Sequence, residues 1–191
     1  MIHNIAREVN MIYLIGGVAR AGKSILCQQF AAELKIGWIS TDLMMELLRV
    51  SNVPGIKREW NASSKAIKTN AEWFFPYLEK FIWGVNSLAE NYVIEGVDFL
   101  PAQISQLSRQ YPIRSLFLGC SQMTLEAFDQ YPGHSRGYSH LPDEVKRQIV
   151  HDVPLWSEVI RQEAKRFSLP YLDTSYDFAQ RIKEALTILL A

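Results

Sequence analysis

Short apolar runs alternate with longer helical segments along this chain of 191 residues. A short apolar run between turn signals is typical of a strand that is buried on both faces. Five segments have this character: residues 11–15, 37–40, 92–95, 113–118 and 170–173. Apolar residues at helical spacing fill the segments between and after them, at 22–34, 72–91, 101–109, 154–167 and 178–190. Because helices separate the strands, the pattern predicts an α/β domain whose five-stranded parallel sheet is covered on both faces.

A glycine-rich stretch joins the first predicted strand to the helix that follows it. Residues 17–24 read GVARAGKS and fit the pattern G-x-x-x-x-G-K-S/T in the context that this pattern requires. Such a loop wraps backbone N–H groups around phosphates, its lysine reaches the β- and γ-phosphates, and its hydroxyl ligates Mg²⁺. The sequence therefore predicts a loop that binds ATP and Mg²⁺, with Lys23 catalytic and Ser24 a metal ligand. The predicted nucleotide contacts are Gly17, Val18, Ala19, Arg20, Ala21, Gly22, Lys23, Ser24 and Ile25.

Asp42 lies at the C-terminal end of the second predicted strand, in the run Ile39-Ser40-Thr41-Asp42. Ligands of open α/β sheets bind beyond the carboxyl ends of the strands, so a carboxylate there can accept the proton of an acceptor hydroxyl or hold a metal-bound water. Aspartate is also a good N-cap for the helix expected next, and both roles can hold together. Asp42 is therefore a candidate catalytic residue that orients the acceptor.

Two acids stand at the end of the third predicted strand. Glu95 is its last residue, and Asp98 follows after Gly96 and Val97. A carboxylate at this edge can hold a water of the Mg²⁺ shell. Strand residues alternate sides and Gly96 breaks the strand, so the pattern leaves open which carboxylate serves the metal. Glu95 is the metal candidate that we favour, and a structural pairing with an arginine is the alternative for either acid.

Residues 129–142 combine prolines, glycines and histidines with little periodicity, which predicts a mobile, lid-like loop within about 129–150. Arg136 is the single arginine of residues 129–142. An arginine on a closing loop can meet the charge of a phosphoryl group during transfer. Arg136 is therefore the first catalytic candidate here and Arg161, on the next helix, the second; a solvated arginine is the alternative. The loop's histidines have no third ligand at hand and predict no metal site.

The segment 43–91 is long for a crossover between strands, and we interpret it as a helical insertion that binds the acceptor. A local basic excess beside a phosphate-transfer site predicts an anionic acceptor, while a solvated helix face is the alternative. The basic residues stand against Glu59 alone and are Arg49, Lys57, Arg58, Lys65 and Lys68.

Composition narrows the class of protein. Twenty lysines and arginines balance twenty aspartates and glutamates, which argues against a nucleic-acid binder that works by neutralising phosphates. No run approaches the ~18–20 apolar residues of a membrane helix, and residues 1–10 lack the apolar centre of a secretory signal. Cys27 and Cys120 form neither a disulfide framework nor a metal-binding spacing. These features predict one cytoplasmic domain over residues 1–191 without nucleic-acid or membrane partners, and they leave the oligomeric state open.

With these elements placed, residues 11–190 resemble the nucleoside-monophosphate-kinase-like group of P-loop kinases, which includes adenylate, shikimate and gluconate kinases, zeta toxins and small 2-phosphoglycerate kinases. The matching segments are GVARAGKS at 17–24, ISTD at 39–42, VIEGVDFLP at 93–101 and LDTS at 172–175. The resemblance implies a three-layer P-loop NTPase sandwich, Mg·ATP as phosphoryl donor and an arginine-bearing lid. Adenylate kinases have a glycine between the residues matching Thr41 and Asp42, and its absence here disfavours AMP as the acceptor.

Together these observations predict an ATP-dependent kinase that transfers the γ-phosphoryl group to a small, anionic acceptor. Phosphorylated metabolites, sugar acids and nucleoside monophosphates belong to that class. The alternative is a P-loop ATPase or nucleotide-dependent switch that acts on a protein partner, for which hydrolysis stimulated by the partner is expected. The choice between ATP and GTP stays open.

Overall fold

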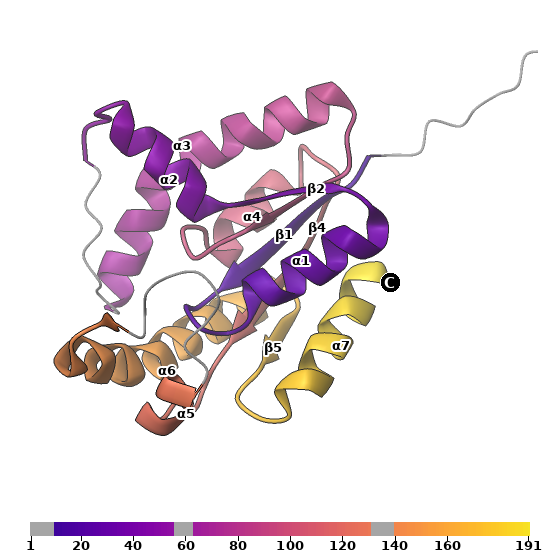
Figure 1. The fold of residues 1–191 in the computed structure, drawn as a ribbon. Helices are drawn as coiled ribbons and strands as arrows, with labels where there is room; N and C mark the ends of the chain where they lie inside the picture. The colour runs from indigo at the N-terminus through magenta and orange to yellow at the C-terminus, as the bar shows by residue number, and fades with distance from the viewer. Residues whose placement is uncertain (1–9, 56–62, 131–139) are drawn as a thin grey trace, which may run out of the picture.

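A computed structural model describes residues 10–55, 63–130 and 140–191, and a five-stranded parallel sheet forms its centre (Figure 1). The strands lie in the order β2-β3-β1-β4-β5. Each lies within two residues of its predicted bounds, so the prediction of the sheet is confirmed. The strands are β1 Ile12–Gly17, β2 Gly37–Ser40, β3 Tyr92–Glu95, β4 Ile113–Gly119 and β5 Tyr171–Asp173.

The register of the sheet gathers the strand ends that carry polar residues. Glu95 lies opposite Ile15 of β1 on one side and opposite Ser40 of β2 on the other. On its other flank β1 pairs with β4, and Gly17 lies opposite Leu118. Because all the strands are parallel, the residues that follow β1, β2 and β3 lie together at the carboxyl-terminal end of the sheet. The chain order reverses around β1, and such a switch point is where open α/β sheets bind ligands.

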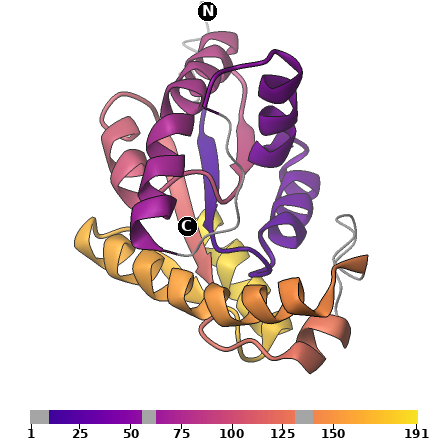
Figure 2. The same cartoon turned by 90° about the vertical axis from the view of Figure 1, so that its left-hand side faces the viewer.

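Helices cover both faces of the sheet (Figures 1 and 2). On one face α1 packs against β2 and β3 and also against α7, which contacts β4. On the other face α3 contacts β1, while α4 and α6 contact β4 and each other. Figure 2 shows α6 running along the lower end of the sheet. The helices are α1 Lys23–Leu34, α2 Thr41–Val50, α3 Ser64–Leu88, α4 Pro101–Leu107, α5 Leu125–Gln130, α6 Asp143–Arg166 and α7 Phe178–Leu190.

The core explains why the apolar runs form the sheet. Leu14, Ile94 and Phe117 are completely buried in three neighbouring strands. Burying one such side chain stabilises the fold by about 1.5–3 kcal/mol. The helices present their apolar stripes to this sheet, with Leu26 and Phe30 buried from α1. The predicted stripe of α3 is buried as far as Val85, whereas Leu88, expected on the same stripe, is 75% exposed at the end of the helix.

Two helical segments differ from the prediction. α6 begins at Asp143, well before residue 154, so residues 143–150 of the predicted lid-like segment are helical. Pro154 lies inside α6, although a proline there normally marks a helix start. Asp143 and Glu144 stabilise the first turn electrostatically, and the buried Val153 and Ile160 anchor the helix before and after the proline. α5 was not predicted either, because its six residues are too few for a periodic signal.

Several predicted features lie outside the described residues. They are Arg136 and most of the predicted mobile loop, together with Lys57, Arg58 and Glu59 of the insertion. Within the described part of the chain, no helix combines the length and the apolar character needed to cross a lipid bilayer.

Candidate functional site

The loop between β1 and α1, which we call the P-loop (residues 17–24), has a backbone that only certain residues can adopt. Gly17 has a φ of 125°, and a Cβ there would lie 1.9 Å from the carbonyl oxygen of Leu118. A side chain at this position would therefore collide with β4. Gly22 is the N-cap of α1 and offers no side chain to cap it. The first backbone N–H groups of α1 are thus available to an anion at the positive end of the helix dipole.

Lys23 is the first residue of α1 and folds back over the P-loop. Its side chain is buried, and its ammonium donates to the carbonyl oxygen of Val18 at 2.6 Å. This contact holds the positive charge of Lys23 over the P-loop. Its contact with the phosphates of a nucleotide stays a prediction.

Ser24 and Glu95 meet at the base of this loop. The Ser24 hydroxyl donates to Oε1 of Glu95 at 3.1 Å, and Glu95 is 1% exposed. Asp98 instead accepts a hydrogen bond from the Thr41 hydroxyl at 2.6 Å. Of the two acids left open by the sequence, the structure therefore places Glu95 against Ser24.

The Ser24 and Glu95 oxygens suit a magnesium ion. Mg²⁺ prefers hard oxygen ligands and is usually held by one or two protein groups together with waters and substrate phosphates. Among the described residues, no group of three or more histidines, cysteines, aspartates or glutamates could hold a metal by itself. A hydroxyl and a buried carboxylate beside a phosphate-binding loop fit an ion that arrives with its nucleotide.

Asp42 lies in the first turn of α2. The N-cap is Ser40, whose hydroxyl accepts from the backbone N–H of Asp42 at 3.3 Å. The capping role that was the alternative for Asp42 therefore belongs to Ser40. Asp42 is half-buried at the edge of the sheet where the P-loop also lies.

A cavity of about 150 Å³ opens between α2, α3 and the loop after β3. The residues predicted to bind an anion do not line it where they are described: Arg49 pairs with Glu46 at 2.7 Å, and Lys65 and Lys68 are exposed on α3. Sequence reasoning missed most of the lining, since polar and aromatic residues on a helix carry no signal for a cavity. The lining residues are Met45, Gly55, Thr69, Asn70, Trp73, Phe74 and Asp98.

Hydrogen bonds connect the loops after β4 and β5 to each other and to the P-loop. The Thr174 hydroxyl donates to the carbonyls of Gly119 and Ala21, at 2.9 and 3.1 Å. Asp173 accepts from the backbone N–H groups of Ser121 and Ser175 and from the Ser175 hydroxyl. Burial raises the pKa of Asp173, but these hydrogen bonds outweigh it and the net pKa is lowered.

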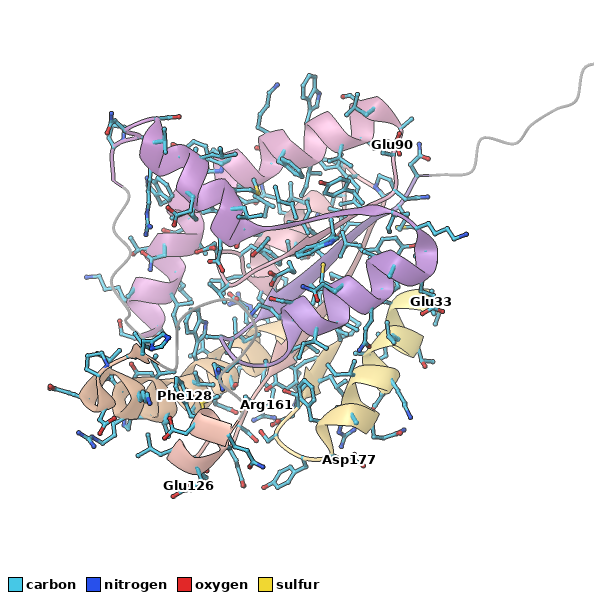
Figure 3. All side chains as sticks on the ribbon, in the orientation of Figure 1. Glu33, Glu90, Glu126, Phe128, Arg161 and Asp177 are labelled. Carbon is cyan, nitrogen blue, oxygen red and sulfur yellow. The ribbon has the colours of Figure 1, made fainter. Side chains whose placement is uncertain are left out.

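Two arginines lie near these loops in different settings (Figure 3). Arg20, at a φ of 68°, stacks over the Phe128 ring at 4.3 Å and donates to the Phe128 carbonyl, which fixes α5 against the P-loop. Arg161, the second candidate for the transferred phosphate, makes two hydrogen bonds to Glu158 at 2.8 and 2.7 Å. These bonds to Glu158 raise the pKa of Arg161. Its role as a phosphate ligand stays a prediction.

Comparison with known proteins supports the fold. No protein-family model and no curated protein sequence matches the chain. Among solved structures, a sugar kinase from a Janibacter species matches with a TM-score of 0.53 at 15% identity, covering 95% of both chains. The chain has the fold of the P-loop kinases.

Two further kinase structures share this fold. A gluconokinase from Sinorhizobium meliloti matches at a TM-score of 0.51 and 16% identity, over 95% of this chain and 91% of that one. A shikimate kinase from Bacteroides thetaiotaomicron matches at 0.51 and 17%, over 93% and 94%. At such identities the likeness concerns the fold, so the assignment of function rests on the geometry of the site.

Proposed function

We propose that this protein is an ATP-dependent kinase that transfers the γ-phosphoryl group to a hydroxyl of a small molecule. The contact between Ser24 and Glu95, beside the buried Lys23 of the P-loop, carries the proposal. These three side chains are the groups that phosphoryl transfer needs in one place, because they supply charge for the phosphates and oxygens for the metal.

Each residue of the loop has a distinct task in this proposal. The backbone N–H groups of the P-loop and of the first turn of α1 bind the phosphates. Lys23 stabilises the negative charge that spreads over the transferred phosphoryl group. Ser24 and Glu95 hold Mg²⁺, which neutralises the charge on the β- and γ-phosphates when it is bound. Arg136 stays the predicted lid arginine.

The cavity between α2 and α3 is the proposed acceptor site. It opens next to Asp98, three residues after Glu95, and it is bounded by the insertion that the sequence assigns to the acceptor. Pockets for drug-sized ligands measure roughly 300–1,000 Å³, so a cavity of about 150 Å³ suits a compact molecule. Within the predicted class of acceptors, this size favours a sugar acid or a small phosphorylated metabolite over a nucleoside monophosphate.

The test is phosphorus NMR of the protein with Mg·ATP and a panel of acceptors: nucleoside monophosphates, phosphoglycerates, sugar acids and shikimate-like alcohols. We expect one new phosphorylated product together with an equal amount of ADP. Lys23→Ala should lower the transfer rate at least ~100-fold, because a fixed charge at the transition state is lost. Lys183→Ala, which changes an exposed lysine of α7, is the matched control and should transfer at the wild-type rate.

Circular dichroism of both variants checks that the fold is retained. A folded Lys23→Ala protein with wild-type transfer would contradict the role given to Lys23. ATP that stays intact, or is slowly hydrolysed whatever the acceptor, would contradict the kinase proposal.

A nucleotide-dependent switch is the second candidate because of one surface feature. Leu43, Leu47 and Val50 of α2 are 58%, 68% and 84% exposed, and their spacing places them along one side of the helix. An exposed apolar stripe is a feature of protein-binding surfaces. Hydrolysis that is unaffected by small acceptors but stimulated by a protein would favour this candidate.

A further inference from the structure

One oxygen of the Asp98 carboxylate accepts a hydrogen bond, and the other accepts none from the described residues. Its Oδ2 accepts a hydrogen bond of 2.6 Å from the hydroxyl of Thr41, a residue that is completely buried. Among the described residues, Oδ1 of Asp98 makes no hydrogen bond, and Asp98 lines the cavity between α2 and α3. A carboxylate can accept several hydrogen bonds, so the side chain is oriented while it retains capacity for a ligand.

From this arrangement we propose that Asp98 is the catalytic residue that accepts the hydroxyl of the acceptor. The cavity would take a compact, ring-sized hydroxyl compound with one apolar face. The inference rests on the proposed kinase function and names its acceptor chemistry.

Asp98 is connected to the phosphate end of the site by a short, fixed segment. Glu95 contacts Ser24, and the backbone N–H of the next residue, Gly96, donates to the carbonyl of Ile15 at 3.1 Å. Gly96 also packs closely against Thr41, the residue that holds Asp98. Three residues of chain span at most about 11 Å, which is the upper limit on the separation of Asp98 from Glu95, the acid that contacts Ser24.

Asp42, the residue that the sequence favours for this task, does not line the cavity. It lies in the first turn of α2, where its backbone is engaged by the Ser40 cap. Both carboxylates stand at the same edge of the sheet, but only Asp98 borders the space where an acceptor would lie.

The other walls of the cavity determine which hydroxyl compounds fit. Trp73 offers a flat apolar face, and its indole N–H donates to the Pro54 carbonyl at 3.1 Å, which fixes the ring. Met45 and Phe74 extend the apolar wall, while Thr69 and Asn70 provide uncharged polar groups. The C–H face of a sugar or cyclic polyol matches this aromatic wall, and its hydroxyls match Asp98 and the uncharged polar groups.

In the proposed transfer, every bond that forms is matched by one that breaks. The acceptor's O–H bond breaks and its proton passes to Oδ1 of Asp98. The acceptor oxygen forms a bond to the γ-phosphorus while the bond between that phosphorus and the bridging oxygen of ATP breaks, and ADP leaves. Asp98 returns its proton to solvent before the next cycle.

The test compares wild type with Asp98→Asn and Asp42→Asn on D-glucose, D-gluconate, shikimate and AMP, with Mg·ATP as donor. For the compound that the wild type phosphorylates, we expect Asp98→Asn to lower kcat at least ~100-fold, because the group that accepts the hydroxyl proton is lost. The KM for ATP should not change, and Asp42→Asn should lower kcat less than tenfold. Glu90→Gln, which changes an exposed acid distant from the site, is the control and should match wild type (Figure 3).

Saturation-transfer NMR of the same four compounds, with a non-hydrolysable ATP analogue present, separates the two proposals. Transfer that survives Asp98→Asn, or that is lost only in Asp42→Asn, would overturn the role of Asp98 while the kinase function stands. Binding that depends on Asp98 without any transfer would overturn the kinase function but support the cavity as a hydroxyl site. If D-glucose, D-gluconate and shikimate neither bind nor react, the assignment of the cavity is overturned.

Discussion

Gly96 and Thr41 lie in contact where the loop after β3 crosses the start of α2. A Cβ on Gly96 would be 2.0 Å from the Thr41 hydroxyl, the group that also donates to Asp98. Thr41 is completely buried, so it has no free space into which it could move. At the scale of the residue, the position of Asp98 therefore depends on the absence of one methyl group at Gly96.

We expect Gly96→Ala to lower the free energy of unfolding by roughly 1–3 kcal/mol, because an extra methyl in a packed site forces its neighbours apart. Gly84→Ala is the matched control: Gly84 lies inside α3, and a Cβ there meets nothing within 4 Å. Alanine favours the helix over glycine, so this variant should gain about 0.5–1 kcal/mol. Urea unfolding of both proteins measures the two changes. A Gly96→Ala protein as stable as Gly84→Ala would show that the contact is not tight.

Among the elements, the loop between β5 and α7 is attached to the P-loop by Thr174. The hydroxyl of Thr174 reaches carbonyls of two other segments, Ala21 in the P-loop and Gly119 at the end of β4. Its side chain is 5% exposed, so water cannot easily replace it. The position of the P-loop is thus set by an element that lies far away in the sequence.

Thr174→Val keeps the shape of the side chain but removes the donor from these buried carbonyls. We expect the free energy of unfolding to fall by about 1–3 kcal/mol, the usual cost of an unsatisfied buried polar group, and ATP binding to weaken. Thr187→Val removes a hydroxyl of the same kind from the exposed surface of α7, where it donates to Lys183, and should change stability by less than about 0.5 kcal/mol. Chemical denaturation and calorimetric ATP titration give both quantities. Equal effects of the two substitutions would contradict the proposed role of the Thr174 hydroxyl in positioning the P-loop.

For the molecule as a whole, the pH dependence of stability comes from groups whose pKa differs between the folded and the unfolded state. Two acids have shifts of opposite sign. Hydrogen bonds lower the pKa of Asp173 against the effect of burial. Burial raises the pKa of Glu163, whose Oε2 has no hydrogen-bond partner among the described residues.

The signs lead to opposite predictions for the two acids. Asp173 stabilises the fold above its ordinary pKa of about 3.9, and this contribution is lost as the pH falls through the lowered value. Asp173→Asn should therefore be less stable than wild type at pH 7, with a difference that shrinks in acid. The raised pKa of Glu163 lowers the free energy of unfolding as the pH rises from the ordinary pKa of about 4.3 through the raised value. Over this pH range, Glu163→Gln should therefore become more stable relative to wild type. Urea unfolding between pH 3 and 7 tests both; parallel curves for the three proteins would contradict the shifts.

The sequence by itself determined the sheet and the glycine-rich loop between β1 and α1. The inner strands follow from runs such as residues 116–118 of β4, because a strand buried on both faces is apolar over most of its length. The backbone of the P-loop follows from residues 17–24, since Gly17 and Gly22 have positive φ values that favour glycine. These features depend on neighbours in the sequence, and for this reason they can be predicted from it.

Only the tertiary structure decided which partner each acid contacts. The sequence places Glu95 and Asp98 three residues apart, but their partners, Ser24 and Thr41, are 71 and 57 residues away along the chain. The cavity likewise arises where α2, α3 and the loop after β3 converge, and the start of α6 depends on burial that compensates for Pro154. Contacts between distant segments are set by the packing of whole elements, which local patterns do not encode.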